Sequence, residues 1–307
     1  FAGATIARKL AENDIQVHII DKRNHIGGNA FDYINNNNER LHKYGPHLLH
    51  GSKDSKAIKF LSKFTDWIKY EHKVRALLKD GTTTPLPVNM NTLEDVYKLR
   101  LKDEFSAKNF INQIRFHDLS PKNTDEVFLS NFGEKLSNIF FRPYTKKMWG
   151  IDPKNLAIGV GSRLPVRINR DDRYFSDSFQ ALPDKGYKSL FENLLSHQKI
   201  TIELNKKFKK TMENDYFHIF LCLPIDSYFD YCFGNLPYRS IIFEERKINE
   251  KNLSAPVINF TDNLKYTRKT QWSLLPNCPK VKGDYHTVTY EIPVDIKDNP
   301  ENFIPVP

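Results

Sequence analysis

Two residues near the start of the chain have the types and the spacing of a dinucleotide-binding site. Gly3 begins a helical pattern over residues 3–12, and Asp21 ends a short apolar strand over residues 16–21. In a dinucleotide-binding βαβ unit, a Gly-rich turn lets the cofactor pyrophosphate lie against a helix N-terminus, and an acid about 20 residues further on accepts hydrogen bonds from the adenosine ribose. Gly3 and Asp21 therefore predict part of such a unit.

The sequence after Asp21 supports this interpretation. Arg23 and the run Gly27, Gly28 and Asn29 supply the basic residue and the glycine pair that commonly follow the acid in flavoproteins. Of the motif G-x-G-x-x-G only the last glycine is present, and no strand precedes it. We therefore expect that the chain is a piece that lacks the first strand of the unit.

The composition fits a soluble protein of two modest domains with reduced thiols. The 307 residues are 39% hydrophobic and 27% charged. No apolar run approaches the roughly 20 residues that a membrane span needs. The three cysteines, Cys222, Cys232 and Cys278, lack C-x-x-C spacing, and an odd number suits a reducing compartment. We therefore expect a cytoplasmic location and no membrane span.

The net charge of +9 is compatible with nucleic acid, a membrane surface or an anionic small substrate. The lysines are spread along the whole chain, and no helix-turn-helix, RNP or zinc-finger pattern organises them, so we expect no nucleic-acid partner. A phosphorylated small molecule fits this charge better. His42, His47 and His50 lie close together, but they lack an H-E-x-x-H pattern or a carboxylate partner, so we expect no metal site.

The remaining elements alternate between helical and extended patterns. Apolar residues at helical spacing predict a helix over about 54–69, and two extended runs around Asp80 and Gly81 predict a hairpin. Further helices are expected over residues 91–101, 125–140 and 186–197, and strands over residues 199–204 and 216–226. Strand-like runs are frequent between residues 240 and 290, so the chain is predicted to be an interleaved α/β protein.

Seven segments, collinear along nearly the whole chain, resemble the UDP-galactopyranose mutase family. In chain order they read IIDKRNHIGGNAFDY, HKYGPHLLH, LPVNMNT, YTKKMWG, RLPVRINRDDRYFSD, PIDSYFDYCFGNLPYRS and INFTDNLKYTR. Seven blocks in order are far more specific than one glycine motif. The resemblance implies an α/β fold with an incomplete Rossmann-like FAD-binding domain, an inserted helical domain and an antiparallel β-sheet substrate region.

The same resemblance implies a division of the chain into three parts. Residues 1–53 correspond to a FAD-binding βαβ portion, residues 54–150 to a mainly helical insert with a hairpin, and residues 151–307 to a mixed β-sheet substrate region with returning flavin-domain strands. In the family, a further segment follows the point at which this chain stops. Family members commonly form homodimers through the helical insert, and we expect a homodimer here.

Members of this family interconvert UDP-galactopyranose and UDP-galactofuranose, which serves galactofuranose-containing cell-surface polysaccharide. N5 of the reduced flavin attacks the anomeric carbon, UDP leaves, and the sugar ring opens and recloses through a different hydroxyl before UDP returns. Because the cofactor carries out this covalent catalysis, the protein is expected to contribute positioning and electrostatics. The resemblance therefore implies FAD as the cofactor and UDP-galactose as the substrate.

The leaving pyrophosphate must be held while it is detached, and forked guanidiniums suit that task better than ammonium groups. Arg163 and Arg268 fall at the two positions where the family places its pyrophosphate-binding arginines. The other substrate-contacting positions are polar or aromatic, as a flat slot for uridine requires. They are His72, Tyr144, Thr145, Trp149, Tyr174 and Asn259. His72 stands where the family usually has an asparagine.

A second set of matched positions is implied to hold the flavin. It comprises Ala2, Gly3, Asp21, Asn29, His47, Leu48 and Phe208. His50 lies on the segment that in the family passes beside the flavin ring. A histidine there can respond to the flavin redox state, because its charge changes near physiological pH. We therefore count His50 with Arg163 and Arg268 as the catalytic candidates.

The chain departs from the family pattern at several positions. Pro143 and Leu223 each stand where the family usually has a glycine. A glycine has a more permissive backbone than leucine. Phe303 and Ile304 replace two tyrosines, and a hydroxyl that would contact phosphate is lost with them. These changes indicate a divergent copy of the family pattern.

Three alternatives stay open at this point. A preference for UDP-N-acetylgalactosamine would keep the same chemistry. A flavin amine oxidase or desaturase would share the cofactor, but it would not need paired arginines for a pyrophosphate. A degenerate flavoprotein relic would bind UDP-sugar without turnover.

Overall fold

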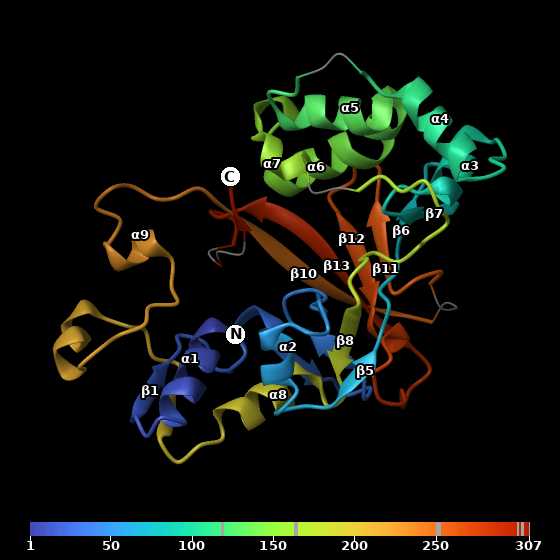
Figure 1. Cartoon of the computed structure of the whole chain (residues 1–307). Helices are drawn as coiled ribbons and strands as arrows, with labels where there is room; N and C mark the ends of the chain where they lie inside the picture. The colour runs from blue at the N-terminus through green and yellow to red at the C-terminus, as the bar shows by residue number, and fades with distance from the viewer. Residues whose placement is uncertain (118–119, 163–164, 250–252, 300, 302–303, 307) are drawn as a thin grey trace. The chain divides into compact units, whose positions relative to one another are not determined.

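Two compact units make up the chain, and each is assembled from segments that are far apart in the sequence (Figure 1). The computed structural model describes residues 1–117, 120–162, 165–249, 253–299, 301 and 304–306. Unit 1 comprises Phe1–Tyr70, Asp177–Leu236 and Pro276–Val281, and unit 2 comprises Glu71–Ser176, Pro237–Leu275 and Lys282–Pro307. The three-part division at residues 53 and 150 concerns function and stays a prediction.

A parallel pair of strands with two helices forms one part of unit 1. Helix α1 (Ala2–Ala11) leads into β1 (Val17–Ile20), and helix α8 (Gly186–Leu195) leads into β9 (Ile200–Glu203). The two strands pair in parallel, and the two helices contact each other. Both strands and α8 were expected from the sequence, and the structure confirms them. The carboxyl ends of β1 and β9 therefore lie at one edge of this small sheet.

Two antiparallel sheets complete the strands of unit 1. Strands β2 (Asp32–Ile34) and β3 (Arg40–His42) form a hairpin. Strand β8 (Phe179–Pro183) lies between β4 (Leu49–Gly51) and β5 (Trp67–Lys69). These short strands bring the segment before residue 70 next to the segment after residue 177, so unit 1 is closed by contacts between distant parts of the sequence.

The N-terminus of α8 is anchored by a buried carboxylate from another element. Asp32 is fully buried, and its two oxygens accept hydrogen bonds from the backbone N–H groups of Tyr187 (2.7 Å) and Lys188 (2.8 Å). Gly186 has φ 82°, and a Cβ there would lie 2.3 Å from Oδ2 of Asp32. A glycine is therefore required at the start of this helix. Burial raises the pKa of Asp32, while the two backbone donors and Arg40 oppose that rise.

We expect Asp32→Ala to lower the free energy of unfolding by about 2–3 kcal/mol, because two backbone donors at a helix N-terminus lose a charged acceptor. Asp32→Asn keeps one carbonyl oxygen and should lose less. Urea unfolding curves measure both effects. Asp54→Ala is the matched control, since the Asp54 side chain is 75% exposed. An Asp32→Ala protein as stable as this control would contradict the anchoring role.

The helix predicted over 54–69 is wrong in its second half. Helix α2 covers only Lys56–Leu61, and β5 follows at Trp67. Ser55 begins the helix by accepting from the Ile58 N–H, and Trp67 pairs with Pro183 of β8. Pairing with a distant strand therefore overrides the helical spacing of the apolar residues, which for short runs cannot separate helix from strand.

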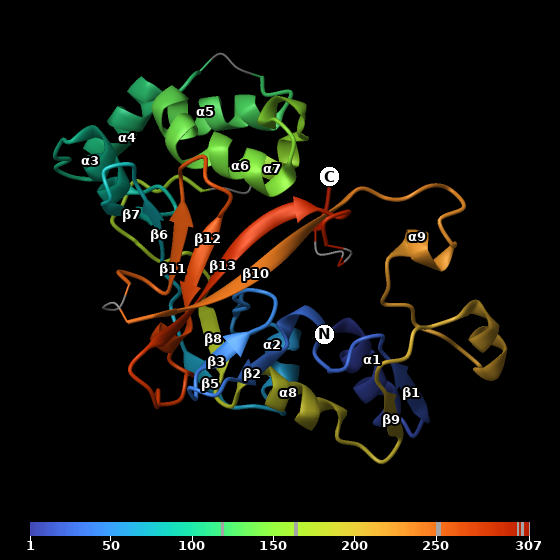
Figure 2. The same ribbon diagram turned by 180° about the vertical axis from the view of Figure 1, so that it is seen from behind.

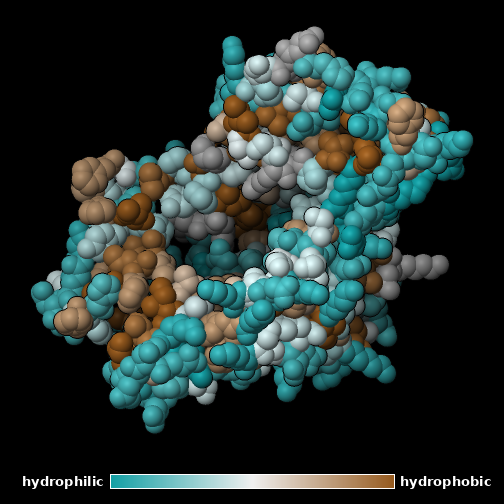
Figure 3. All heavy atoms as spheres, in the orientation of Figure 1, coloured by the Kyte–Doolittle hydropathy of each residue, from teal (hydrophilic) through white to brown (hydrophobic). Residues whose placement is uncertain are grey.

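The strand predicted over 216–226 is also wrong. Residues 216–222 belong to no strand in the described part of the chain, and α9 (Ile225–Tyr228) follows them. Phe217 is completely exposed, and Phe220 is 50% exposed. Figure 3 shows apolar side chains gathered on the surface around this segment. Within the described residues this apolar run has no strand partner, so its pattern alone does not make it a strand.

Unit 2 is built on a seven-stranded sheet with the order β14-β10-β13-β12-β11-β6-β7. The strands are β6 (Val74–Leu77), β7 (Thr83–Leu86), β10 (Tyr238–Ile248), β11 (Val257–Phe260), β12 (Arg268–Gln271), β13 (His286–Asp295) and β14 (Ile304–Pro305). All neighbours are antiparallel except β6 and β11. The hairpin predicted around Asp80 is confirmed as β6–β7, and Figure 2 shows β10 and β13 running side by side.

Helices pack on this sheet and contact both β7, at one end of it, and β13. They are α3 (Met90–Tyr97), α4 (Glu104–Ile114), α5 (Thr124–Leu136), a π-helical turn η2 (Ser137–Phe141), α6 (Arg142–Trp149) and α7 (Ile158–Ser162). Asn89, Asp103 and Asn123 begin α3, α4 and α5 with side chains that accept backbone N–H groups. The helices predicted over 91–101 and 125–140 are confirmed in place, although α3 ends earlier.

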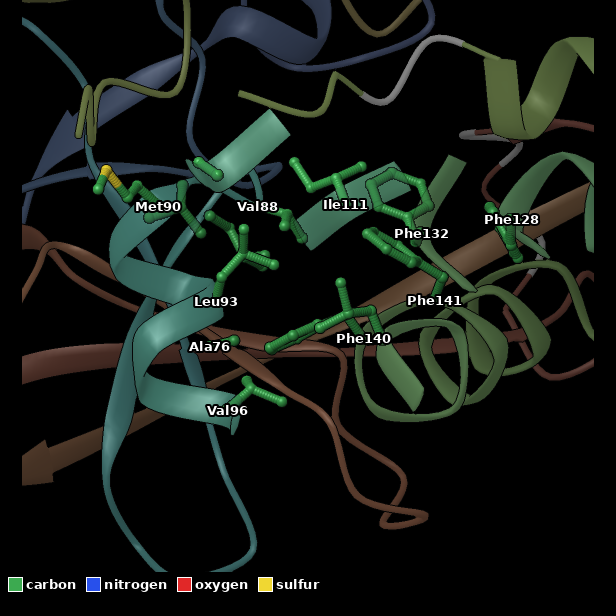
Figure 4. Packing of buried hydrophobic residues seen from close by; sticks show 14 of the residues in the cluster. Ala76, Val88, Met90, Leu93, Val96, Ile111, Phe128, Phe132, Phe140 and Phe141 are labelled. Atoms are coloured by element: carbon green, nitrogen blue, oxygen red, sulfur yellow. The ribbon is translucent and has the colours of Figure 1, made fainter. Parts of the chain in front are cut away.

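The hydrophobic core of unit 2 joins these helices to the sheet. Leu93, Ile111 and Phe132 lie on three different helices and point toward one another in Figure 4. Ala76 of β6 and Val257 of β11 contribute the sheet side of the same cluster. Among the described residues, no helix is both long and apolar enough to cross a membrane. On the helical side, the buried residues of this core end at Phe140 and Phe141, directly before α6, whose Trp149 belongs to a separate small cluster.

Candidate functional site

Three polar side chains lie in a row across the sheet of unit 2. Arg268 is the first residue of β12, and it pairs with Asn259 on one neighbouring strand and with Glu291 on the other. Residues directly opposite each other on adjacent strands point to the same face of a sheet. The strand register therefore places an amide, a guanidinium and a carboxylate side by side.

Arg268 and Glu291 form a close ion pair. Nε of Arg268 lies 2.7 Å from Oε1 of Glu291, whose side chain is only 1% exposed, whereas the Arg268 side chain is 29% exposed. Burial acts to lower the pKa of Arg268, but the carboxylate of Glu291 and the phenols of Tyr144 and Tyr174 outweigh it and raise that pKa above its ordinary value. The guanidinium is therefore permanently charged and partly open to a ligand.

Aromatic and imidazole groups surround this guanidinium. Tyr144 lies on α6, and Tyr174 lies on the segment before unit 1 resumes at Asp177. The rings of His72 and Tyr174 meet edge to face at 5.9 Å, and the Tyr174 N–H donates to the carbonyl oxygen of His72 (2.6 Å). Burial, and then the charge of Arg268, lower the pKa of His72 to about 3. His72 is therefore a neutral hydrogen-bonding group at neutral pH.

The structure thus brings together most of the residues predicted to contact the substrate. His72, Tyr144, Tyr174, Asn259 and Arg268 all belong to this one region of unit 2. Their roles as ligand contacts stay predictions, since the structure gives their positions and not their ligands.

The other predicted substrate residues are placed differently. Trp149 is 9% exposed and packs with Leu156 and Val160 in a small hydrophobic cluster, and Thr145 is buried on the same helix. This packing favours a structural role for Trp149, although a ligand contact stays a prediction. Arg163 lies outside the residues that the structure describes, so its predicted role is untested.

Lys147 and Glu291 were missed by the sequence reasoning. Nζ of Lys147 donates to the carbonyl oxygens of Phe260 (3.1 Å) and Tyr266 (2.8 Å), and it lies 3.6 Å from Oδ1 of Asp262. Lys147 stands inside the segment YTKKMWG, so a signal for it was present, whereas Glu291 stands in an ordinary strand pattern. Only the strand register shows that Glu291 faces Arg268.

The residues predicted for the cofactor lie in unit 1. Ala2 and Gly3 are in the first turn of α1, and Asp21 follows β1 directly. Oδ1 of Asp21 accepts the Arg23 N–H (2.9 Å), and the Asp21 carbonyl oxygen accepts the Lys206 N–H just after β9. The acid therefore stands at the carboxyl edge of the parallel pair, where open α/β sheets bind their ligands.

Gly27 and Gly28, which precede Asn29, have a backbone conformation that lets the main chain approach an anion closely. Gly27 has φ 88° and Gly28 has φ 57°, and a Cβ on Gly28 would meet nothing within 4 Å. Consecutive N–H groups in such a turn can form a concave anion site. Phe208 is half-buried in the loop after β9. The backbone N–H groups at Gly27 and Gly28 fit the pyrophosphate of a dinucleotide, and the carboxylate of Asp21 fits its ribose.

The histidine segment of unit 1 is held by local contacts. His42 is buried, and burial together with the charges of His47 and Arg40 lowers its pKa to about 3. Its Nδ1 accepts the backbone N–H of His47 (3.0 Å), which precedes Leu48 and β4. Nδ1 of His50 lies 2.8 Å from Oδ2 of Asp177, and both side chains are more than one third exposed. His50 therefore has a carboxylate partner that the sequence did not reveal.

Comparisons with known proteins give matches over nearly the whole chain. A family model described as GLF, UDP-galactopyranose mutase, matches residues 139–307, and one described as a NAD(P)-binding Rossmann-like domain matches residues 1–64. The dTDP-fucopyranose mutase of Escherichia coli is 36% identical over 98% of this chain and 81% of its own length. A probable UDP-galactopyranose mutase of Klebsiella pneumoniae is 32% identical over 88% of this chain and 71% of its own length.

A solved structure shares the fold. The crystal structure of a reduced UDP-galactopyranose mutase superposes with a TM-score of 0.66 over 95% of this chain and 72% of that protein, at 16% identity. With the Rossmann-like match to residues 1–64, this likeness confirms the predicted α/β class and the Rossmann-like portion.

Proposed function

Because the chain belongs to the UDP-galactopyranose mutase family of isomerases, we propose that it interconverts the pyranose and furanose forms of a nucleotide-bound sugar with the help of reduced FAD. The observation that carries this proposal is the row of Asn259, Arg268 and Glu291 with Tyr144, Tyr174 and His72 around it. A charged, partly open guanidinium beside aromatic rings suits a nucleoside diphosphate.

The residues of unit 1 would hold the cofactor. Asp21 would accept hydrogen bonds from the ribose, and the turn at Gly27 and Gly28 would face a phosphate or the middle of the cofactor with Asn29. When bound, reduced FAD would supply the nucleophilic nitrogen that keeps the sugar attached while its ring opens and recloses. His50 would lie beside the flavin ring, where its charge could respond to the redox state of the flavin.

The residues of unit 2 would hold the leaving nucleotide. Arg268 meets Glu291 most closely through Nε, so its far edge, which carries both Nη atoms, would receive a diphosphate oxygen. Tyr144 and Tyr174 would line the slot for the base and the sugar. His72, neutral at neutral pH, would offer one hydrogen bond to a sugar hydroxyl without adding charge. Arg163 would be the second guanidinium.

Two pairs of nucleotide and sugar are candidates, and a preference for UDP-N-acetylgalactosamine would be a variant of the first. UDP-galactose is our first candidate, and we propose that it serves galactofuranose in a cell-surface polysaccharide, in a cytoplasmic homodimer as family members commonly are. The second candidate is dTDP-fucose, because the Escherichia coli relative that carries this name is 36% identical over 98% of the chain. The amine oxidase and desaturase alternative is not favoured, since the two relatives described above are mutases.

The test is to purify the chain, record its flavin spectrum, and assay both sugar nucleotides before and after reduction with dithionite. We expect a flavin spectrum and turnover of one substrate only after reduction. Turnover that does not depend on reduction would contradict the proposal. A colourless protein that binds UDP or dTDP without turnover would replace it with the relic.

A further inference from the structure

A half-buried lysine joins the two elements that carry the proposed nucleotide contacts. Lys147 lies on α6, one helical turn after Tyr144, so both side chains emerge from neighbouring positions on the helix. Its ammonium group contacts the carbonyl oxygens of Phe260 and Tyr266. Phe260 ends β11 directly after Asn259, and Tyr266 comes shortly before Arg268 at the start of β12. Lys147 therefore touches both arms of the β11–β12 hairpin.

The contacts use two of the three donors of the lysine, and a carboxylate lies 3.6 Å from its nitrogen. An ammonium group has three donors, and here two carbonyl oxygens and the carboxylate of Asp262 surround it. The side chain is only 13% exposed. A charge in such a position is costly unless it is paired and hydrogen-bonded, so the hairpin and α6 are expected to keep this contact whenever unit 2 is folded.

The hairpin itself does not need the lysine. The Phe260 N–H donates to the carbonyl oxygen of Thr267 (2.9 Å), and Oγ1 of Thr261 donates to the carbonyl oxygen of Leu77 (2.6 Å). These contacts pair the two arms and fasten them to β6. What Lys147 adds is the connection from the hairpin to α6, and so from Arg268 to Tyr144.

We propose that Lys147 is a positioning residue that sets the spacing between the aromatic helix α6 and the β11–β12 hairpin, and thereby lets one nucleoside diphosphate engage both. The inference rests on the proposed function. The base would bind beside Tyr144 on α6, and the diphosphate beside Arg268 on the hairpin. The fixed spacing would therefore raise the affinity for the whole ligand, whereas a nucleoside alone would contact only α6. Such preorganisation raises the affinity for the whole ligand by removing the cost of ordering the site during binding.

The experiment measures the dissociation constants of UDP, dTDP and uridine by calorimetry and by ligand-observed NMR. We expect Lys147→Met to raise the dissociation constant of the nucleoside diphosphate that the wild type prefers by about tenfold. The dissociation constant of uridine should change by less than about twofold. Lys147→Arg, which can donate to the same carbonyl oxygens, should restore part of the affinity. Lys146→Met is the matched control, because the neighbouring Lys146 is exposed, and it should bind like the wild type.

Two outcomes would overturn the inference. They are a Lys147→Met protein that binds the diphosphate as tightly as the wild type, and one that loses uridine as strongly as the diphosphate. If Lys147→Met does not fold, Lys147→Gln takes its place, since its shorter and neutral amide weakens both carbonyl contacts, and an unchanged diphosphate affinity in that variant would overturn the inference as well. A wild-type protein that binds neither UDP nor dTDP overturns the proposed function itself, which separates the two failures.

Discussion

Replacing Arg268 with alanine is expected to lower kcat/KM on the order of 10³-fold, since a charged group aimed at the departing diphosphate is lost from a partly desolvated site. Arg268→Lys should recover little of this activity. The guanidinium of Arg268 meets Glu291 through Nε and has two further nitrogens for a phosphate. A lysine has a single nitrogen, so it cannot make both contacts in this way. Steady-state kinetics with the preferred sugar nucleotide measure both variants.

The stability of these variants must be separated from their chemistry. Removing the guanidinium leaves the buried carboxylate of Glu291 without its partner, which costs about 3–5 kcal/mol in comparable buried pairs. The double variant Arg268→Met with Glu291→Gln removes both charges, so it should regain stability without regaining activity. Arg246→Ala is the control on the same sheet, where the side chain is 42% exposed. Wild-type kinetics in Arg268→Ala would refute the assignment.

The sequence predicted the elements that have strong local signals. The hairpin at Asp80 and Gly81 depends on turn chemistry, and the structure confirms it as β6–β7. The strand before Asp21 and the strand after residue 199 were also found, because short apolar runs bounded by polar residues define them. An antiparallel sheet followed from the family resemblance, and the large sheet is antiparallel except for the pair β6 and β11.

The two wrong elements failed for a common reason. The helix predicted to reach Ile68 stops at Leu61 because Trp67 pairs with β8, and the strand predicted at 216–226 does not form because its apolar run has no strand partner among the described residues. Periodicity reports which residues are apolar, whereas a strand also needs a neighbour to pair with. That neighbour lies elsewhere in the sequence, and the local pattern holds no information about it.

The candidate site shows the same limit. His72, Tyr144, Tyr174, Asn259 and Arg268 were found by resemblance, since the positions are far apart in the sequence and no spacing joins them. Lys147 and Glu291 could not be found in this way. Their contacts depend on the register of β12 with β13 and on the approach of α6 to a hairpin, which only the folded chain displays.

Glu291→Gln is expected to lower kcat about 10²-fold, because a guanidinium displaced by about 1 Å holds the diphosphate in the wrong geometry. Glutamine keeps the size of the side chain but removes the charge that raises the pKa of Arg268 and fixes its Nε. The loss should appear in kcat more than in KM, since Arg268 remains positively charged and still attracts the anion. Stopped assays over a range of substrate concentrations separate the two parameters.

The choice of control decides what the Glu291 result means. Glu245→Gln alters an exposed carboxylate on β10 of the same sheet, and it should leave both parameters unchanged. If Glu291→Gln melts at a lower temperature but keeps the wild-type kcat, Glu291 serves only the stability of the sheet. A lowered kcat, measured at a temperature at which the variant is still folded, would instead show that the carboxylate acts through Arg268. The two readouts therefore distinguish a structural carboxylate from a positioning one.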